Sequence, residues 1–505
     1  MSSKTDAPGA GPADWSVGWW GIGALTAVAL VARVISLNNG LWVDEIYSLV
    51  ESFRPPLLQV VTTFPGDTQH PLYALLANGA EKLLGDARWV IRLPAMLFGA
   101  ATVPALFYFG RRVTSQREAF LAALLLAVSY HHVWFSQNAR GYSMLAFWTV
   151  TTSLLFWDAL LRPRTRAAVG YAVLAALGAY THLTMVFVVV SHSIVGGAWA
   201  VTRPQDRQRW IRWCLLAFGL SALLTVALYG PVLGQLLDFF LHRPSRLQGI
   251  SSPGWALAEA VRVLKTGLGA APGLVAGAVV AALGTASYWR TNRWALALFV
   301  VPGVVTILGA LAVRGTMYPR FFFSLIGFAL LIGVRGAAVL ALAIARRVHA
   351  PERYATLAGR WVTGVVGLMI VLSATSLAYN YRWPKQDFIG AADWIATNVP
   401  PGDAIVTAGV TVFPYREYVP RPWPEIPEGG ESLIDEMRAT RRVWVVYVFP
   451  RYLEISHPYL TRLIREECGR EVRFRGSLGG GDIVVCPLSA TGSGATAATQ
   501  PVGSA

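Results

Sequence analysis

Long apolar runs recur along the first 381 residues of this 505-residue chain, with few charges inside them. A helix of roughly 20 apolar residues is what a hydrocarbon core about 30 Å thick requires. Hydrophobic residues make up 54% of the sequence and charged residues 14%, whereas soluble domains carry about 25% charge. The chain lacks the polar residues to cover a water-facing surface of its size. This excludes a soluble enzyme, a disordered protein and a disulfide scaffold, and predicts a multi-pass α-helical membrane protein.

Arginine-rich loops separate the apolar runs and indicate their direction. The clusters lie at 111–117, 162–166, 203–212, 290–293 and 346–360, in alternate loops if eleven runs span the membrane. The protein is then expected in the cytoplasmic (inner) membrane. The positive-inside rule places its N-terminus in the cytoplasm and everything after residue 381 on the external side. The predicted spans lie near 19–37, 93–110, 118–135, 143–161, 167–181, 184–201, 211–235, 272–288, 294–313, 321–343 and 361–381.

The net charge of +15 does not indicate a nucleic-acid partner. Binding of a polyanion needs a continuous basic patch with interleaved aromatic residues, whereas these arginines lie in short separate loops. The sequence therefore predicts the lipid bilayer as a partner and excludes nucleic acid.

Two shorter segments, 71–84 and 252–268, are apolar on one face and carry charges on the other. We predict that both lie as amphipathic helices in the membrane interface. If 71–84 crossed the membrane, every later arginine cluster would fall on the wrong side.

From residue 382 the long apolar runs stop, and charged residues and prolines become common. Alternating patterns predict strands at 404–407, 442–449 and 482–486, with helices at 387–399 and 455–467. We therefore predict a small α/β domain on the external side. The predicted divisions are a disordered N-terminus (1–16), a transmembrane domain (17–381) with a first external loop (38–92), the α/β domain (382–488) and a disordered tail (489–505).

The chain has three cysteines. Cys214 falls in an apolar run and is expected in the core. Cys468 and Cys486 fall in the predicted external domain, where disulfides persist. Two buried thiols and one disulfide both remain open at this point.

The predicted external loops carry the reactive side chains. Asp44 and Glu45 follow the first span directly, where adjacent carboxylates suit a general base with a neighbour that tunes it or shares a metal ion. A solvated loop or a helix cap is the alternative. His70 and Arg140 are candidate donors to an anion; capping of a helix and snorkelling to water are their alternatives. The other polar candidates in external turns are Tyr73, Tyr142, His182, Tyr318 and Arg320.

Four motifs follow one another in an order that resembles the GT-C membrane glycosyltransferases. They are WVDEIYS, HPLY, RLPAMLFGAATVPALFYFGRR and SYHHVWFSQNARGYSML. The chain is similar in particular to the family 39 group, which includes protein O-mannosyltransferases and lipid A aminoarabinose transferases. The resemblance covers roughly residues 17–200, with YPRFFFSLIGF and PKQDFIGAADWI as further matches. One proline of the family's HPPLY motif is missing here.

The resemblance implies an inverting transfer of a sugar from a polyprenyl-phosphate carrier to a lipid, glycan or protein hydroxyl. It places the acidic catalytic residue at Asp44 with Glu45 beside it, and it matches Arg140 and Arg320 to family arginines. Arg320 is then the residue that meets the carrier phosphate, with Arg140, His70 and His182 as further phosphate donors. Tyr73, Tyr142 and Tyr318 are expected to bind substrate. No cofactor is implied with certainty, and a divalent cation at Asp44 and Glu45 is left open. A transporter or flippase of lipid-linked saccharides is the alternative function, and an inactive scaffold of the same fold is a third.

Overall fold

The structure is a computed structural model that describes residues 16–66, 69–242, 258, 261–262, 271–312 and 318–491. Most of the predicted helix at 252–268 and most of the predicted disordered ends lie outside the described residues. The chain divides into two compact units. The first unit comprises Met1–Asn38 and Glu51–Tyr381, and the second comprises Asn39–Val50 and Arg382–Ala505.

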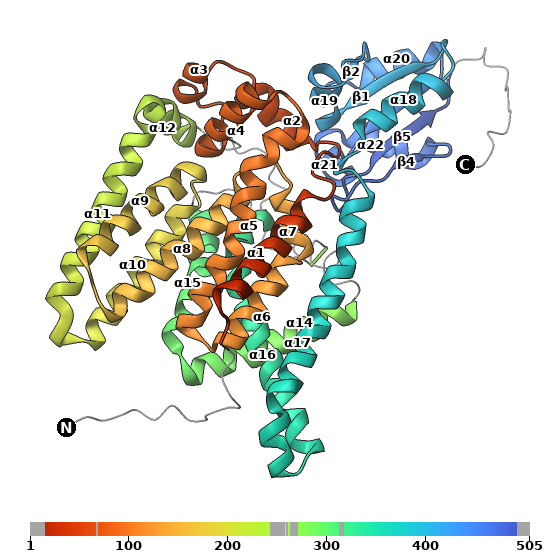
Figure 1. Ribbon diagram of the computed structural model, residues 1–505. Helices are drawn as coiled ribbons and strands as arrows, with labels where there is room; N and C mark the ends of the chain where they lie inside the picture. Colours follow the sequence, from red (N-terminus) through yellow and green to blue (C-terminus); the bar gives the residue numbers. More distant parts are fainter. Residues whose placement is uncertain are drawn as a thin grey trace, which may run out of the picture. The chain divides into compact units, whose positions relative to one another are not determined.

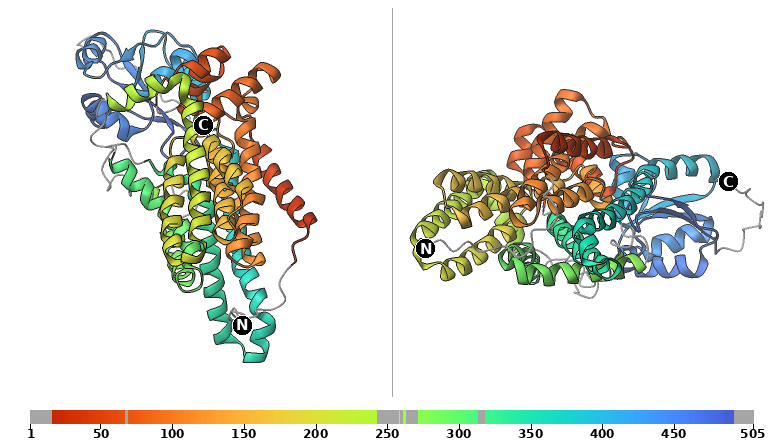
Figure 2. Two further views of the ribbon diagram at one scale, coloured as in Figure 1. Left: turned by 90° about the vertical axis from the view of Figure 1, so that its left-hand side faces the viewer. Right: turned by 60° about the horizontal axis from the view of Figure 1, so that its bottom comes forward.

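The first unit is a bundle of long helices. In the described part, α5 packs along α8, α9 along α11 and α14 along α16 (Figures 1 and 2). Its helices are α1 (Trp19–Val34), α3 (Leu57–Thr62), α4 (Pro71–Leu84), α5 (Arg88–Val113), α6 (Gln116–Ala127), α7 (Tyr130–Ser136), α8 (Tyr142–Leu161), α9 (Thr165–Thr181), α10 (Met185–Thr202), α11 (Arg207–Tyr229), α12 (Leu233–Leu241), α14 (Ala271–Thr291), α15 (Arg293–Ala312), α16 (Ile326–Val348) and α17 (Pro351–Arg382). Shorter turns are η2 (Pro204–Asp206), η3 (Gly230–Val232) and η4 (Pro319–Leu325), and the π-turn η1 (Leu49–Phe53) enters the unit.

A helix lies at each of the eleven predicted apolar runs. Among the described residues, seven helices are long and apolar enough to cross a membrane, or eight if one bent pair counts as a single span. The multi-pass helical fold is thus confirmed, while the count of eleven remains a prediction. The candidate spans are Arg88–Val113, Tyr142–Leu161, Met185–Thr202, Arg207–Leu241, Arg293–Ala312, Pro319–Val348 and Leu357–Arg382.

The run predicted as one helix at 118–135 is broken into α6 and α7, which meet at an angle of 57°. A break frees backbone carbonyls, which are costly to bury without donors. Arg33 of α1 donates to the Ala127 carbonyl at 3.1 Å, and the Ser373 hydroxyl of α17 donates to the Val128 carbonyl at 3.1 Å. These distant side chains stabilise the bend, which is why the local sequence did not predict it.

Helices α14 and α16 approach so closely that glycine is required on both. A Cβ atom at Gly284 would lie 2.0 Å from the Ile332 carbonyl oxygen, and one at Gly336 would lie 1.8 Å from the Val280 carbonyl oxygen. Small residues that let helix backbones touch are the usual means of association in a membrane, where apolar burial contributes little.

The helix predicted at 71–84 forms with those bounds as α4 and lies against α5 and α9 (Figure 1). Pro71 occupies the first turn, where its missing N–H costs nothing. Asn78 donates to the carbonyls of Phe53 and Pro55 at 2.6 and 2.8 Å. The polar residue inside this helix therefore secures the chain that precedes it.

The second unit contains a five-stranded sheet in the order β2-β1-β3-β5-β4 (Figure 1). Strands β2, β1 and β3 are parallel, whereas β5 is antiparallel to both β3 and β4. The three predicted strands are present; β2 and β4 were missed because they are too short for an alternating pattern. The strands are β1 (Ala404–Ala408), β2 (Glu425–Ile426), β3 (Val443–Tyr447), β4 (Val472–Phe474) and β5 (Ile483–Leu488).

The helices of the second unit follow the sequence signals with one correction. The helix predicted at 455–467 is two helices broken before Pro458, because proline lacks the N–H that a continuous helix needs. The side chain of Asp387 caps the N-terminus of the next predicted helix, because it accepts the Gly390 N–H at 2.9 Å. The helical elements are α2 (Val43–Ser48), α18 (Phe388–Asn398), η5 (Gly409–Thr411), α19 (Val412–Glu417), α20 (Glu431–Thr440), α21 (Pro450–Ser456) and α22 (Pro458–Glu467).

Cys468 and Cys486 form a disulfide across 18 residues, which resolves the alternative that the sequence left open. Such a closure stabilises a fold by about 3 kcal/mol, largely by restricting the unfolded chain. We expect reduction to increase amide hydrogen exchange in β3 and β5 by roughly 100-fold in the full-length protein, since 1.4 kcal/mol is tenfold. Cys214→Ala serves as the control for the remaining thiol. Unchanged exchange after complete reduction would contradict a stabilising role.

Candidate active site

Four of the predicted residues come together at the ends of helices of the first unit. His70 directly precedes α4, Arg140 lies in the turn between α7 and α8, His182 directly follows α9, and Arg320 lies in η4. The ring centroids of His70 and His182 are 4.7 Å apart. Both arginines act electrostatically on both histidines. We call His70, Arg140, His182 and Arg320 the Arg–His cluster.

The hydrogen bonds of the two histidines define which ring nitrogen carries the proton. The Gly141 N–H donates to Nδ1 of His70 at 3.0 Å, and the Thr184 N–H donates to Nδ1 of His182 at 3.2 Å. Because Nδ1 accepts in both rings, the neutral form carries its proton on Nε2. A Cβ at position 141 would lie 2.6 Å from Nδ1 of His70, so glycine is needed for this approach. In each imidazole, Nδ1 is thus held by a backbone N–H, and Nε2 carries the N–H that acts as a donor.

Burial and neighbouring positive charge keep both histidines neutral. Burial, followed by the charges of Arg140 and Arg320, lowers the pKa of His182 to about 3. Burial, Arg140, His182 and Arg320 together lower the pKa of His70 well below its ordinary value. The cluster thus combines two guanidinium groups with two neutral N–H donors. This is a donor set for an anion such as a phosphate.

Two predicted tyrosines belong with the cluster and one does not. The Tyr142 ring centroid lies 5.0 Å from that of His70 and 5.6 Å from that of His182. The Tyr318 ring lies under the Arg320 guanidinium at 4.3 Å. Tyr73 instead donates its hydroxyl to the Ile91 carbonyl at 2.6 Å and is buried between α4 and α5. The structure therefore gives Tyr73 a packing role.

Glu51 is an acidic residue that no sequence pattern singled out. Burial raises the pKa of Glu51, and the charge of Arg140 lowers it in opposition. Glu51 lies in the π-turn η1, a distortion that often occurs at functional sites. No motif marks this residue; its only signal was an acidic group in a membrane-proximal loop.

Asp44 and Glu45 lie in α2, within the second unit, and have different surroundings. Glu45 is buried, and its Oε2 accepts the Trp42 N–H at 3.2 Å, as in a capping box. Asp44 occupies the first turn of α2 and is only half-buried. Of the two adjacent carboxylates, Glu45 thus stabilises the local helix, and Asp44 is the more accessible.

Among the described residues, no group of three or more His, Cys, Asp or Glu side chains could hold a metal ion. The described residues thus offer no such ligand set for the divalent cation that was considered at Asp44 and Glu45.

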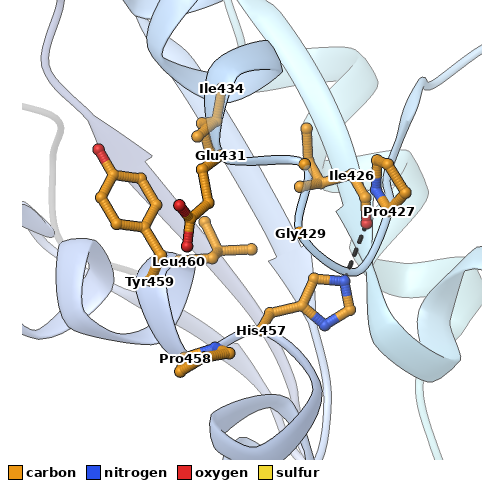
Figure 3. Close-up of a pocket in the computed structure, with 10 residues that line it drawn as sticks. Ile426, Pro427, Gly429, Glu431, Ile434, His457, Pro458, Tyr459 and Leu460 are labelled. Atoms are coloured by element: carbon orange, nitrogen blue, oxygen red, sulfur yellow. Dashed lines mark hydrogen bonds between the residues drawn. The ribbon is translucent and has the colours of Figure 1, made fainter.

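A separate small pocket lies in the second unit, beside β2 and the start of α22 (Figure 3). His457 lines it but is used structurally: its Nε2 donates to the Ile426 carbonyl at 2.9 Å, and its Nδ1 pairs with the Ser456 hydroxyl at 2.8 Å. Glu431 is the acidic residue among those that line the pocket (Figure 3). These surroundings do not provide a donor set comparable to the Arg–His cluster.

The lowered pKa values of His70 and His182 predict how stability depends on pH. An unfolded histidine binds a proton as the pH falls through about 6.5, while folded His182 stays neutral until about pH 3. Protons therefore favour the unfolded state, and the stability present above pH 6.5 is lost as the pH falls toward 3. At pH 5 the loss amounts to about 2 kcal/mol for His182, and the lowered pKa of His70 acts in the same direction.

We expect the Tm of the detergent-solubilised protein to fall between pH 7 and pH 5, and to fall less in His70→Asn/His182→Asn. Asparagine keeps an acceptor near the Nδ1 position without the titrating ring. An equal fall in both proteins would contradict these assignments.

The fold is that of a multi-pass α-helical membrane protein, and it resembles the GT-C glycosyltransferases. Residues 68–233 match the family model described as dolichyl-phosphate-mannose-protein mannosyltransferase. This range includes His70, Arg140 and His182. No sequence of a curated protein matches the chain.

Two solved structures share the fold. ArnT from Cupriavidus metallidurans, bound to undecaprenyl phosphate, has a TM-score of 0.50 and 14% identity, and the match covers 92% of this chain and 97% of that one. The oligosaccharyltransferase of Archaeoglobus fulgidus, in complex with Zn and sulfate, has a TM-score of 0.53 and 12% identity, covering 92% of this chain and 72% of that one. The predicted resemblance to the GT-C glycosyltransferases is confirmed, and so is the predicted class of enzyme.

Proposed function

We propose that this protein is an inverting glycosyltransferase that moves a sugar from a polyprenyl-phosphate carrier to an acceptor hydroxyl on the extracytoplasmic side of the membrane. The observation that carries the proposal is the Arg–His cluster, in which four separate helix ends present cationic and neutral donors to one place. A phosphate attached to a lipid tail is an anion that such a site at the ends of membrane helices would bind.

The cluster would stabilise the leaving group. When the bond between the anomeric carbon and the phosphate oxygen breaks, the carrier phosphate gains negative charge. Fixed donors aimed at developing charge are the largest single contribution in many enzymes. Arg140 and Arg320 would supply planar, permanently charged forks, and His70 and His182 would add N–H donors from Nε2. Tyr142 and Tyr318 would shape the site around the substrate.

Asp44 would act as the base in a single displacement. The acceptor oxygen attacks the anomeric carbon and loses its proton to the Asp44 carboxylate, while the electrons of the breaking bond go to the phosphate. One displacement on the face opposite the leaving group inverts the anomeric configuration. Glu45 would support Asp44 by holding the first turn of α2. The half-buried position of Asp44 supports the assignment.

Two observations support an external site. The arginine clusters favour a cytoplasmic position for the loops that carry them. The loops between them, which carry the candidate residues, are then external. The Cys468–Cys486 disulfide lies in the same unit as Asp44, and disulfides persist in oxidising compartments. The carrier class is supported by the shared fold of ArnT bound to undecaprenyl phosphate. The acceptor is a lipid, glycan or protein hydroxyl.

The test is transfer by the purified protein in detergent, where transport between compartments has no meaning. We expect consumption of a polyprenyl-phosphate sugar, release of polyprenyl phosphate and a product of opposite anomeric configuration by NMR. Carrier binding without consumption of any donor sugar would favour the transporter alternative, which the comparisons do not favour. A product with retained configuration would contradict the single displacement.

A further inference from the structure

The helix that carries Asp44 is held by residues more than 300 positions later in the chain. The Val43 N–H donates to Oε1 of Gln386 at 2.8 Å, and Nε2 of Gln386 donates to the Gly481 carbonyl at 3.3 Å. Gln386 is 1% exposed. One buried amide thus joins the first turn of α2 to the loop before β5, and it satisfies a helix N–H that has no partner within the helix.

A second anchor lies at the other end of α2. The rings of Tyr47 and Phe413 are stacked, with centroids 3.8 Å apart and planes 13° from parallel. Phe413 belongs to α19, which follows β1 through η5 and so is fixed by the sheet. Stacked aromatic pairs of this kind add stability beyond the burial of their area.

The chain entering α2 packs on the same residues. A Cβ at Gly40 would lie 3.1 Å from both the Gln386 carbonyl oxygen and Cβ of Pro384. The approach at Gly40, the hydrogen bond at Val43 and the stack at Tyr47 bracket Asp44 on both sides. Rotation of Asp44 about the axis of α2 would disrupt the Val43 hydrogen bond and the Tyr47 stack.

We propose that Gln386 and Phe413 are positioning residues that orient the Asp44 carboxylate for proton transfer. The inference rests on the proposed role of Asp44 as the base. The sheet-containing unit would then contribute to catalysis directly, because it fixes the helix of the base. A displacement of about 1 Å in a catalytic group can cost 100-fold in rate, so loss of either anchor should lower turnover without weakening the carrier site.

The experiment uses Gln386→Met, which keeps size but removes both hydrogen bonds, and Phe413→Leu, which removes the stack. We expect kcat to fall 10- to 100-fold in each, with unchanged KM for the donor. Phe413→Tyr should restore most of the rate because it keeps the stack. Trp394→Leu is the matched control: it disrupts another aromatic pair of the same unit, with Trp444, and should leave kcat near normal. If kcat and Tm fall together and KM for the donor rises, the proposal is overturned in favour of a structural role.

A double-mutant cycle separates positioning from stability. If Gln386 acts through Asp44, Gln386→Met should have little further effect on the residual transfer of Asp44→Asn. If Asp44→Asn is strongly impaired and Gln386→Met still lowers its rate by the same factor as in the wild type, the positioning role of Gln386 is overturned, while the proposed function stands. Near-normal transfer by Asp44→Asn would instead remove the proposed base, and the inference would fall with it.

Discussion

Replacement of Asp44 by asparagine should lower the rate of sugar transfer by 10²- to 10⁴-fold, the usual cost of losing acid–base catalysis. Asparagine keeps the size of the side chain and an acceptor oxygen but removes the charge and the basicity. Folding should persist, because the contacts of Gly40, Val43 and Tyr47 that hold α2 are unchanged. Carrier binding should persist as well, because the Arg–His cluster is intact. The measurement is kcat with a polyprenyl-phosphate sugar, beside Tm and carrier affinity.

Two further variants sharpen this prediction. Asp86→Asn changes an exposed carboxylate of the same loop and should leave transfer unchanged. Glu45→Gln should cost far less than Asp44→Asn, because glutamine can still accept the Trp42 N–H. A loss in Glu45→Gln as large as that in Asp44→Asn, at normal stability, would assign the two carboxylates a joint chemical role. Near-normal transfer by Asp44→Asn would remove Asp44 from the mechanism.

Replacement of Arg320 by glutamine should lower kcat/KM for the donor by about 10²- to 10³-fold, as expected for loss of one donor to developing charge. Arg320→Lys should lie between glutamine and the wild type, since a point charge replaces a planar fork. The same ordering is expected at Arg140. Steady-state kinetics with varied donor concentration measure the effect.

The control for the arginine series is Arg164→Gln, an exposed arginine of a predicted cytoplasmic loop. It should transfer normally. If Arg320→Gln loses no more activity than Arg164→Gln, the cluster has no part in donor use.

Much of the Arg–His cluster could be predicted from the sequence. The alternation of arginine clusters indicated which loops share a side, and the loops of the other side contained His70, Arg140, His182 and Arg320. The turn motif around Arg140 and the proline after His70 made fixed positions expected. Helix α4 was predicted with its observed bounds, since an amphipathic period and a starting proline are local signals.

The interactions that could not be predicted are those between residues distant in sequence. Neither Gln386 nor Phe413 carries a local signal that it contacts α2. Likewise, Arg33 and Ser373 give no indication that they stabilise the break between α6 and α7. Glu45 was assigned chemistry because it adjoins Asp44, and only the structure showed its carboxylate at the Trp42 N–H. Period and composition determine elements and faces, but contacts across hundreds of residues depend on tertiary packing.

The central claim is that the Arg–His cluster binds the phosphate of a lipid carrier, and native mass spectrometry of the purified protein tests it most directly. Polyprenyl phosphate and the matching neutral polyprenol would be compared on the wild type, Asp44→Asn and Arg140→Gln/Arg320→Gln. We expect polyprenyl phosphate to bind to the wild type and Asp44→Asn alike, and polyprenol to bind much more weakly. We also expect the double arginine variant to lose the preference for phosphate while remaining folded. Equal binding of the two lipids by the wild type, or an unchanged phosphate preference in the double variant, would contradict it.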